Sequence, residues 1–449
     1  MSVPHSDASS STRSIGDIQQ RSPSDLKPWP TNPRTHPSNQ LTKIVASIRQ
    51  FGFTMPVLID EANVILSGHG RVEAAKQLKL PSIPVRVATG WSLMDKRAYV
   101  IADNKLALLS AWDVALLKSE IEILVTEEFE IELTGFSTAE IDLMLEEPGA
   151  DADDLQPTEL AVAAVSCLGD VWQLGHHLLL CGDALAEASY VTLLRGEQAD
   201  MSVTDPPYNV KVLGHVGGLG KIKHKEFAMA SGEMDASQFK AFLSNACKQL
   251  CSHTVDGAIS YVFMDWRHMT EMLDAARPAF GPVKQLCVWV KDNAGMGSFY
   301  RSQHELAFVF KKGDAPHVNN FELGQHGRYR TNVWEYPGAS SKTGRELLEL
   351  HPTVKPVAMI ADAIRDCSPR KGLILDPFAG SGTVLLAAER KGRRARAIEL
   401  DPHYVDVGIA RWQRATGKRA VRVGTGQTWD EVRELRLTES PAKEVSHVV

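Results

Sequence analysis

The chain has 449 residues, of which 43% are hydrophobic and 23% charged, and its formal net charge is −6. This is the composition of an ordinary globular protein, and the length exceeds what one hydrophobic core usually supports, so two or three domains are expected. The charge excludes a uniformly basic nucleic-acid binder, and no apolar run approaches the roughly 20 residues of a membrane helix.

The first residues are polar and rich in serine. They lack the apolar core of a secretory signal, so we expect a cytoplasmic protein whose residues 1–16 form a disordered tail. The cysteines form no C-x-x-C pair and several lie in apolar runs, which favours reduced core thiols and no metal site. The six cysteines are Cys167, Cys181, Cys247, Cys251, Cys287 and Cys367.

Residues 17–145 are predicted to form a small α+β domain. Strands are expected at 56–60, 64–66 and 83–87, and amphipathic helices over most of 93–146. One further helix is indicated by four apolar residues spaced i, i+3, i+4 and i+7, which are Leu41, Ile44, Val45 and Ile48.

The turn Gly68-His69-Gly70-Arg71 stands between a predicted strand and a helix, where glycines allow the backbone to approach a ligand. Together with residues 32–34 and 102–108, it makes residues 17–145 resemble the ParB-like domain of phage and chromosomal DNA-handling proteins. CTP-binding members of that superfamily carry Gly-Glu-Arg-Arg-x-Arg-Ala here, whereas this chain has His69, Gly70 and Glu73 in place of the glutamate and two arginines. We therefore expect a DNA-contacting or docking role rather than nucleotide hydrolysis.

Residues 146–162 are acidic, contain proline and glycine, and are predicted to be an interdomain linker. A second domain is predicted over 163–425, with a target-recognition insert at about 291–345, and residues 426–449 are predicted to be a C-terminal tail. The first two strands of this second domain are predicted on either side of Gly175, and the second of them ends at Asp183.

The tetrapeptide Asp205-Pro206-Pro207-Tyr208 follows the apolar run 199–204, which predicts a buried strand. The prolines fix the backbone and remove two amide donors, leaving a carboxylate, a free carbonyl and an aromatic face at the end of a strand. Such a group can accept two hydrogen bonds from a planar amine and stack on its ring. By itself, the tetrapeptide fits an ordinary Pro-Pro turn equally well.

Helix and strand alternate over 236–290, which predicts a parallel sheet with helices on both faces. The Gly-rich, basic stretch 209–235 lacks the spacing of a phosphate loop and fits a mobile loop near the substrate. Within 291–345, arginine and aromatic side chains indicate a nucleic-acid surface, although each arginine alone fits a solvated charge. The predicted DNA-binding residues are Tyr300, Arg301, Arg328, Arg330 and Trp334.

Residues 372–402 predict strand, Gly-rich turn, helix, strand and acid. Glu399 can accept hydrogen bonds from two ribose hydroxyls, and Leu385 stands where a dinucleotide fingerprint would have a third glycine. An adenosine without phosphates therefore fits this unit better than a pyrophosphate does.

Asp376 to Thr383 resembles the S-adenosylmethionine-binding motif of DNA amino-methyltransferases, and Asp205 to Tyr208 resembles their catalytic motif. Residues 351–356 (HPTVKP) match the segment that usually precedes the cofactor motif in these enzymes. Because the catalytic motif comes first, the resemblance is to the β class, the adenine-specific DPPY type, here with a ParB-like domain as in phage and prophage DNA modification methylases. It covers roughly residues 165–415.

The resemblance implies a Rossmann-like sheet, S-adenosylmethionine as cofactor, double-stranded DNA as partner and a possible homodimer. The catalytic residues carried over are Asp205, Pro206, Pro207 and Tyr208. The residues carried over for the cofactor, with Asp183 near its adenine, are Asp183, Lys355, Asp376, Pro377, Phe378, Ala379, Gly380, Ser381, Gly382, Thr383, Glu399 and Asp401.

Several alternatives stay open at this stage. Cytosine N4 is the runner-up to adenine N6, since relatives acting on cytosine more often have serine at the position of Asp205. RNA or glutamine methylation fits less well, because those relatives tend to have asparagine there. Two other hypotheses are a CTP-binding ParB-like protein with a passenger methylase, and a nuclease fused to a methylase. The N-terminal domain shows no carboxylate cluster with metal-ligand spacing for the nuclease.

Overall fold

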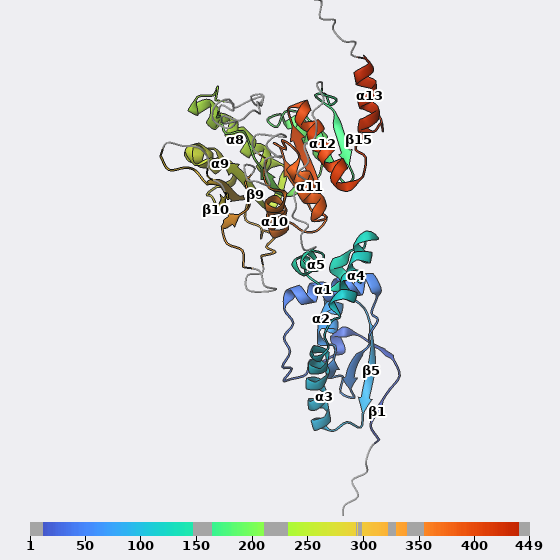
Figure 1. The fold of residues 1–449 in the computed structure, drawn as a ribbon. Coiled ribbons are helices and arrows are strands. Elements are labelled where there is room, and N and C mark those ends of the chain that lie inside the picture. Colours follow the sequence, from blue (N-terminus) through green and yellow to red (C-terminus); the bar gives the residue numbers. More distant parts are fainter. Residues whose placement is uncertain are drawn as a thin grey trace, which may run out of the picture. The chain divides into compact units, whose positions relative to one another are not determined.

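The computed structural model describes residues 12–146, 164–210, 232–292, 294, 299–321, 329–338 and 354–439. The chain divides into two compact units, Met1–Leu145 and Glu146–Val449 (Figure 1). Residues 147–162 of the expected linker and residues 211–231 of the predicted Gly-rich loop lie outside the described residues. None of the helices in the described part of the chain combines the length and the apolar character that crossing a bilayer requires.

The first unit contains a sheet with strand order β1-β5-β3-β4, to which β2 is added along β5. Leu26, Val57, Ile59, Ile65, Val72, Ile83 and Val85 form its main core. The strands are β1 (Ser14–Ile15), β2 (Gln19–Arg21), β3 (Val57–Asp60), β4 (Ile65–Ser67) and β5 (Ile83–Thr89). The α-helices are α1 (Ser38–Phe51), α2 (His69–Gln77), α3 (Leu93–Leu106), α4 (Val114–Thr126) and α5 (Thr138–Met144).

These elements confirm the predicted order of helices and strands in this unit, with one correction at its start. The disordered tail predicted for residues 1–16 is too long, because Ser14 and Ile15 form a strand that pairs with Thr89 and Ala88 of β5. The polar composition suggested disorder, but backbone pairing along an open strand edge does not depend on apolar side chains.

The second unit is built on a ten-stranded sheet with the order β12-β10-β11-β9-β8-β13-β14-β7-β6-β15. Its strands are β6 (Val171–Leu174), β7 (His177–Cys181), β8 (Ala199–Thr204), β9 (Thr254–Met264), β10 (Gln285–Val290), β11 (His304–Lys311), β12 (Val333–Glu335), β13 (Leu373–Asp376), β14 (Arg394–Glu399) and β15 (Val421–Arg422). The helices described are α6 (Glu187–Leu194), α8 (Ala236–Ser252), α9 (Met269–Phe280), α10 (Val357–Cys367), α11 (Thr383–Arg390), α12 (Pro402–Thr416) and α13 (Trp429–Glu439).

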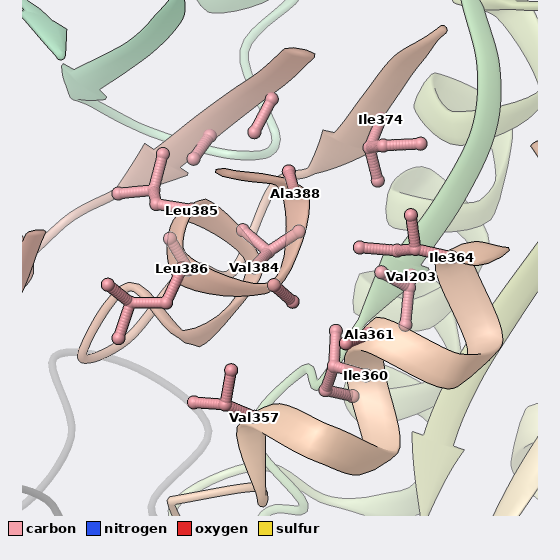
Figure 2. Packing of buried hydrophobic residues seen from close by; sticks show 14 of the residues in the cluster. Val203, Val357, Ile360, Ala361, Ile364, Ile374, Val384, Leu385, Leu386 and Ala388 are labelled. Carbon is pink, nitrogen blue, oxygen red and sulfur yellow. The ribbon is translucent and has the colours of Figure 1, made fainter. Parts of the chain in front are cut away.

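Helices cover both faces of this sheet, as predicted. Successive residues of a strand point to opposite faces, so one strand packs against helices on both sides. Leu178 and Leu180 of β7 pack in a cluster with α6, α8 and α9. Leu179 and Cys181 of the same strand pack in another cluster with α10, α11 and α12. Figure 2 shows part of the second cluster, to which Ile364 of α10, Val203 of β8 and Ile374 of β13 all belong.

The predicted parallel sheet is only partly correct. The five central strands, β9-β8-β13-β14-β7, are parallel. In contrast, β11 runs antiparallel to both β9 and β10, and β6 runs antiparallel to β7 and β15. The sheet is therefore mixed, with the parallel strands in the middle, where both faces are buried.

Two predicted irregular segments contain regular structure. Residues 304–311 of the presumed insert form β11, whose Phe308 and Phe310 are almost fully buried. In the presumed C-terminal tail, residues 429–439 form α13, which buries Trp429 and Val432. These apolar residues lie three positions apart, on one face of the helix, and Arg436 pairs with Asp170.

Candidate active site

Asp205 to Tyr208 begins directly after β8, and the Gly-rich turn begins at the end of the neighbouring strand β13. The next described helix after β8 (α8) lies on one face of the sheet, and the helix after β13 (α11) lies on the other. The two motifs therefore flank a topological switch point, where the carboxyl ends of parallel strands leave a crevice for a ligand.

A hydrogen bond joins the two motifs. Thr204, the last residue of β8, donates from Oγ1 to Asp376 Oδ1 at 2.7 Å, and the backbone amide of Phe378 donates to the same oxygen at 3.1 Å. Burial raises the pKa of Asp376 to about 7 despite these two hydrogen bonds. Asp376 thus fixes the start of the turn against the strand that carries the tetrapeptide.

The turn between β13 and α11 depends on glycine at two positions. Gly380 and Gly382 both have positive φ, at 51° and 78°. A Cβ on Gly382 would lie 2.9 Å from the Cα of Gly408 in α12, so a side chain would be strained and crowded there. Arg411 of α12 donates to the carbonyl and the hydroxyl of Ser381, both at 2.8 Å, and so holds the turn from behind.

Glu399 ends β14, the next strand of the sheet. One of its carboxylate oxygens accepts the amide of Gly380 and the other accepts the amide of Asp401, both at 2.8 Å. Burial raises the pKa of Glu399 to about 7, although both amides favour the ionised form. Asp401 caps α12 through the amide of His403.

One cavity connects these groups. It is lined by Ala184, Val203 to Tyr208, Val210, Phe263, Val354, Lys355, Ile360, Asp376 to Ser381, Thr383, Val384, Glu399 to Asp401 and Tyr404. The structure thereby brings most of the predicted catalytic and cofactor residues to one site. Asp183 is placed differently, since its carboxylate caps the amide of Leu185 at 2.8 Å and its neighbour Ala184 lines the cavity.

The side chains of Asp205 and Tyr208 belong to a cluster of charged and polar groups that sequence analysis did not predict. Tyr208 donates from its hydroxyl to Asp205 Oδ1 at 2.6 Å, and the Lys355 ammonium contacts Asp205 Oδ2. Lys355 Nζ also lies 3.1 Å from Glu305 Oε2, and Lys291 pairs with the other oxygen of Glu305. Lys355, predicted as a cofactor residue, lines the cavity, and its ammonium lies between two carboxylates.

The charges of this cluster act on one another. Burial raises the pKa of Asp205, Lys355 counteracts that rise, and the nearby Glu305 carboxylate reinforces it. Burial also opposes the ionisation of Glu305, but Lys355 and Lys291 overcome it and lower its pKa to about 2. Burial likewise disfavours the Lys355 ammonium, yet Asp205 and Glu305 hold its pKa above the usual value.

Sequence reasoning missed Glu305 and Lys291. Glu305 is the second residue of β11 and is followed by five buried residues, so the isolated acid in an apolar run was the available signal. Lys291 follows the apolar strand β10 in the same way.

The predicted nucleic-acid surface needs two corrections. Trp334 is only 4% exposed and packs in the core, so it cannot stack on a base. Arg330 pairs with Asp366 at 2.9 Å and Asp362 at 3.3 Å, which fastens the segment containing β12 to α10. Arginine and aromatic residues close in sequence occur both in packed cores and on nucleic-acid surfaces, so the pattern alone did not separate them.

Tyr300 is 88% exposed, and its ring lies 4.6 Å from that of the equally exposed Phe299. Arg301 donates to the carbonyl of Ala294 at 2.9 Å. Arg328 lies outside the described residues. Of the two predicted aromatic residues, Tyr300 therefore remains available for stacking, and the unpredicted Phe299 lies beside it.

In the first unit, the residues of the predicted ParB-like turn serve its packing. Gly68 has a φ of 101°, and Gly70 is buried against Ile44 and His36. His69 Nε2 accepts the amide of Trp29 at 3.1 Å. Arg71 donates to the carbonyl of Met55 at 2.6 Å and to that of Pro56 at 3.2 Å.

Comparison with protein families assigns three regions. Residues 199–410 match the N6/N4 DNA methylase family, residues 7–103 match the ParB N-terminal domain, and residues 115–168 match the ParB-methyltransferase HTH domain.

Individual proteins are similar to each unit. The ParB-like nuclease domain-containing protein YnaK of Escherichia coli (strain K12) is 53% identical over 66 residues, which are 15% of this chain and 76% of that protein. The DNA adenine methyltransferase YhdJ of the same organism is 25% identical over 291 residues, which are 58% of this chain and 92% of that protein. The solved structure of PvuII DNA methyltransferase (cytosine-N4-specific) is 15% identical and covers 59% of this chain and 92% of that one, with a TM-score of 0.42.

Proposed function

We propose a reaction for this chain from the family to which it belongs: it is a DNA methylase of the N6/N4 type that also carries ParB-like domains, and its substrate is DNA. In the proposed reaction, a methyl group passes from S-adenosylmethionine to the exocyclic N6 amine of adenine. The observation that carries the proposal is the single cavity that contains both Asp205 and the Gly380–Glu399 pair.

The residues of the cavity fit S-adenosylmethionine. Four of the lining residues are acidic, namely Asp205, Asp376, Glu399 and Asp401, and Lys355 is the one lysine or arginine among the described residues of the lining. Such a lining favours a ligand with a cationic sulfonium and ammonium group and disfavours phosphates. Glu399 would accept hydrogen bonds from the ribose hydroxyls, while the aromatic rings of Phe378 and Tyr404 line the same cavity. When bound, the cofactor supplies an electrophilic methyl group.

Asp205 and Pro206 would prepare the acceptor amine. The lone pair of an adenine amine is delocalised into the ring, so the amine is a poor nucleophile. Hydrogen bonds from its two N–H groups to the Asp205 carboxylate and the Pro206 carbonyl would favour a pyramidal nitrogen with a localised lone pair. The nitrogen would then attack the methyl carbon as the bond from that carbon to sulfur breaks, with the sulfur keeping the electron pair, and the methylated amine would release its extra proton to solvent afterwards. Cysteine nucleophiles are needed for cytosine C5 methylation, which is a different reaction.

The target base lies inside a duplex and must be rotated out before it can reach Asp205. Rotation costs a few kcal/mol and is compensated by stacking in the active site. Tyr208 lines the cavity beside Asp205 and would provide the stacking face, while Tyr300 and Phe299 would contact DNA outside the cavity.

Adenine is favoured over cytosine by Asp205 itself, since the methylases that this chain resembles more often have serine there when they act on cytosine. The similarity to YhdJ, a DNA adenine methyltransferase, along 92% of its length supports the same choice. Long-read sequencing of DNA from a methylation-deficient host that expresses the chain tests it. We expect N6-methyladenine at a defined sequence. Modified cytosine in that position would replace the proposal by cytosine N4 methylation.

For the ParB-like unit we propose a role in DNA contact or docking. His69 and Arg71 are engaged with backbone groups of their own unit, and residues 115–168 match an HTH domain. Gel-shift titrations of the full chain with and without CTP test this role. We expect DNA binding that is independent of CTP, whereas loading that requires CTP would make this unit a nucleotide-dependent clamp.

A further inference from the structure

Glu305 lies close to Tyr208 and Lys355, the two side chains that donate to the Asp205 carboxylate. The hydroxyl of Tyr208 lies 2.6 Å from Asp205 Oδ1 and 3.2 Å from Glu305 Oε2. The Lys355 ammonium contacts Asp205 Oδ2 and lies 3.1 Å from the same Glu305 oxygen. Each donor therefore has a second acceptor close by, on β11, whereas Asp205 lies in the turn after β8.

This arrangement matters because the target amine needs the oxygens that these donors use. In the structure, each Asp205 oxygen already accepts one hydrogen bond, from Tyr208 or from Lys355, so the amine must approach along the lone-pair directions that these two donors leave. A lysine held on Asp205 also makes the carboxylate a weaker acceptor for the amine, because the positive charge stabilises its electrons.

Aromatic rings confine the ammonium to the space between the two carboxylates. Lys355 Nζ lies 5.2 Å from the ring centroid of Phe263, 5.6 Å from that of Tyr208 and 5.9 Å from that of Trp289. The side chain of Lys355 is only 5% exposed. These rings stabilise the cation in the position where it contacts both carboxylates.

Charge balance gives Lys291 a part in this arrangement. Two carboxylates, Asp205 and Glu305, face two ammonium groups, Lys355 and Lys291. A neutral amine that binds to Asp205 keeps this balance if Lys355 stays nearby on Glu305. Loss of Lys355 would leave a buried carboxylate without a counter-ion, which favours its protonation.

We infer that Lys355 is a positioning residue for methyl transfer, which keeps Asp205 ionised and oriented before the base arrives, and that Glu305 accepts its ammonium when the target amine binds Asp205. This inference rests on the proposed function and adds a role for two residues that do not belong to the tetrapeptide. It requires no covalent step.

The charged groups facing Asp205 set the direction of the expected pH effects. They are Lys355 before α10, Glu305 on β11, Tyr208 on the same turn and Asp376 on β13, with Lys291 behind Glu305 and Asp265 facing Tyr208. Removing the positive charge of Lys355 raises the pKa of Asp205 further, and removing the negative charge of Glu305 lowers it.

The test compares the pH dependence of methyl transfer in Lys355→Met and Glu305→Gln, with DNA varied at saturating cofactor. We expect the acidic limb of kcat/KM to move to higher pH in Lys355→Met and to lower pH in Glu305→Gln, each by roughly one unit. In Glu305→Gln, kcat should also fall by about tenfold, because Lys355 loses its second charged acceptor. Lys355→Arg should return the limb toward its wild-type position, since it restores the charge.

Controls separate these effects from damage to the fold. Lys240→Met removes an exposed ion pair with Asp274 in the same unit and should leave the pH profile unchanged. Calorimetric titration with S-adenosylmethionine should give the same affinity for Glu305→Gln as for the wild type. If Lys355→Met does not fold, the shift of the acidic limb of kcat/KM in Glu305→Gln tests the inference by itself.

Limbs that stay in place or move in the same direction would overturn the inference. When the wild-type chain methylates DNA and Asp205→Ala does not, such a result leaves the proposed function intact. A wild-type chain that leaves DNA unmethylated would refute the proposed function and the inference together.

Discussion

The two halves of the active site hold their carboxylates by different means. In the cofactor half, Glu399 and Asp376 accept hydrogen bonds from backbone amides of the turn that follows β13 and of the segment that follows β14. In the acceptor half, Asp205 and Glu305 are held by Lys355, Lys291 and Tyr208, which come from separate parts of the chain. Backbone amides are fixed by the fold, whereas paired side chains can exchange partners, so the first half is suited to binding and the second to a change of contacts.

The largest effect is expected from Asp205→Ala, which removes the acceptor of the target amine and leaves the cofactor half in place. Methyl transfer should fall by roughly 1,000-fold or more, as when a positioned acid or base is lost. Incorporation of radiolabelled methyl into DNA measures this loss, and calorimetry should show cofactor affinity near that of the wild type. Substantial turnover in Asp205→Ala would remove Asp205 from the mechanism.

Glu399→Ala should impair the cofactor half of the site. It removes the acceptor proposed for the ribose and leaves the amides of Gly380 and Asp401 without their partner, so the affinity for S-adenosylmethionine should fall by about 10- to 100-fold. DNA affinity, measured in parallel by gel shift, should change little. Equal losses of both affinities would mean that the halves are not separate.

Gly382→Ala tests the rigidity of the cofactor turn. The alanine would have to keep a positive φ, and its Cβ would lie 2.9 Å from the Cα of Gly408, so the turn and α12 must move apart. We expect a loss of stability of about 1–3 kcal/mol in chemical denaturation, together with weaker cofactor binding. Gly417→Ala is a suitable control, because Gly417 also has positive φ but has no atom near its Cβ position. It should show only the cost of the backbone conformation.

A smaller effect is expected from pH on the cofactor half. Burial raises the pKa of Glu399 to about 7 from its usual 4.5, so the folded protein binds more protons than the unfolded chain between these values. Without cofactor, this contribution to stability is present at low pH and is lost as pH rises through 7. The ionised carboxylate is the better acceptor for hydroxyls and the better partner for a cation.

Affinity for S-adenosylmethionine should therefore increase a few-fold between pH 6 and pH 8. Calorimetry at both values measures the change, and Glu399→Gln should reduce it. Affinity that is unchanged, or tighter at pH 6, would contradict the assignment of Glu399 to the cofactor.

The difference between the halves also explains how much of the site could be predicted. Asp376, Gly380, Gly382 and Glu399 lie within one βαβ unit, where spacing along the chain determines proximity. Glu305 lies 100 residues after Asp205 and reaches it only because β11 adds to the far side of β9. No local pattern predicts the pairing of β11 with β9, since β11 lies in a segment whose Gly, Arg and Asn residues suggest an irregular insert.

The fold shows the same division between local and distant information. The strand before Asp205 was predicted at 199–204, the bounds observed for β8, because its apolar run is short and ends at prolines. Trp334 and Arg330 were misplaced, since their burial depends on α10 and β10, which are distant in sequence. Local patterns thus predict elements and turns, whereas the pairing of buried charges depends on the assembled sheet.

The central claim is that Asp205 prepares an adenine amine for a methyl group supplied at the Gly-rich turn. The most direct measurement incubates the purified full chain with unmethylated duplex DNA and radiolabelled S-adenosylmethionine, followed by hydrolysis of the DNA and separation of its nucleosides. We expect the label in N6-methyldeoxyadenosine, and none when Asp205→Ala replaces the wild type. Label in N4-methyldeoxycytidine, or label that persists in Asp205→Ala, would contradict the account.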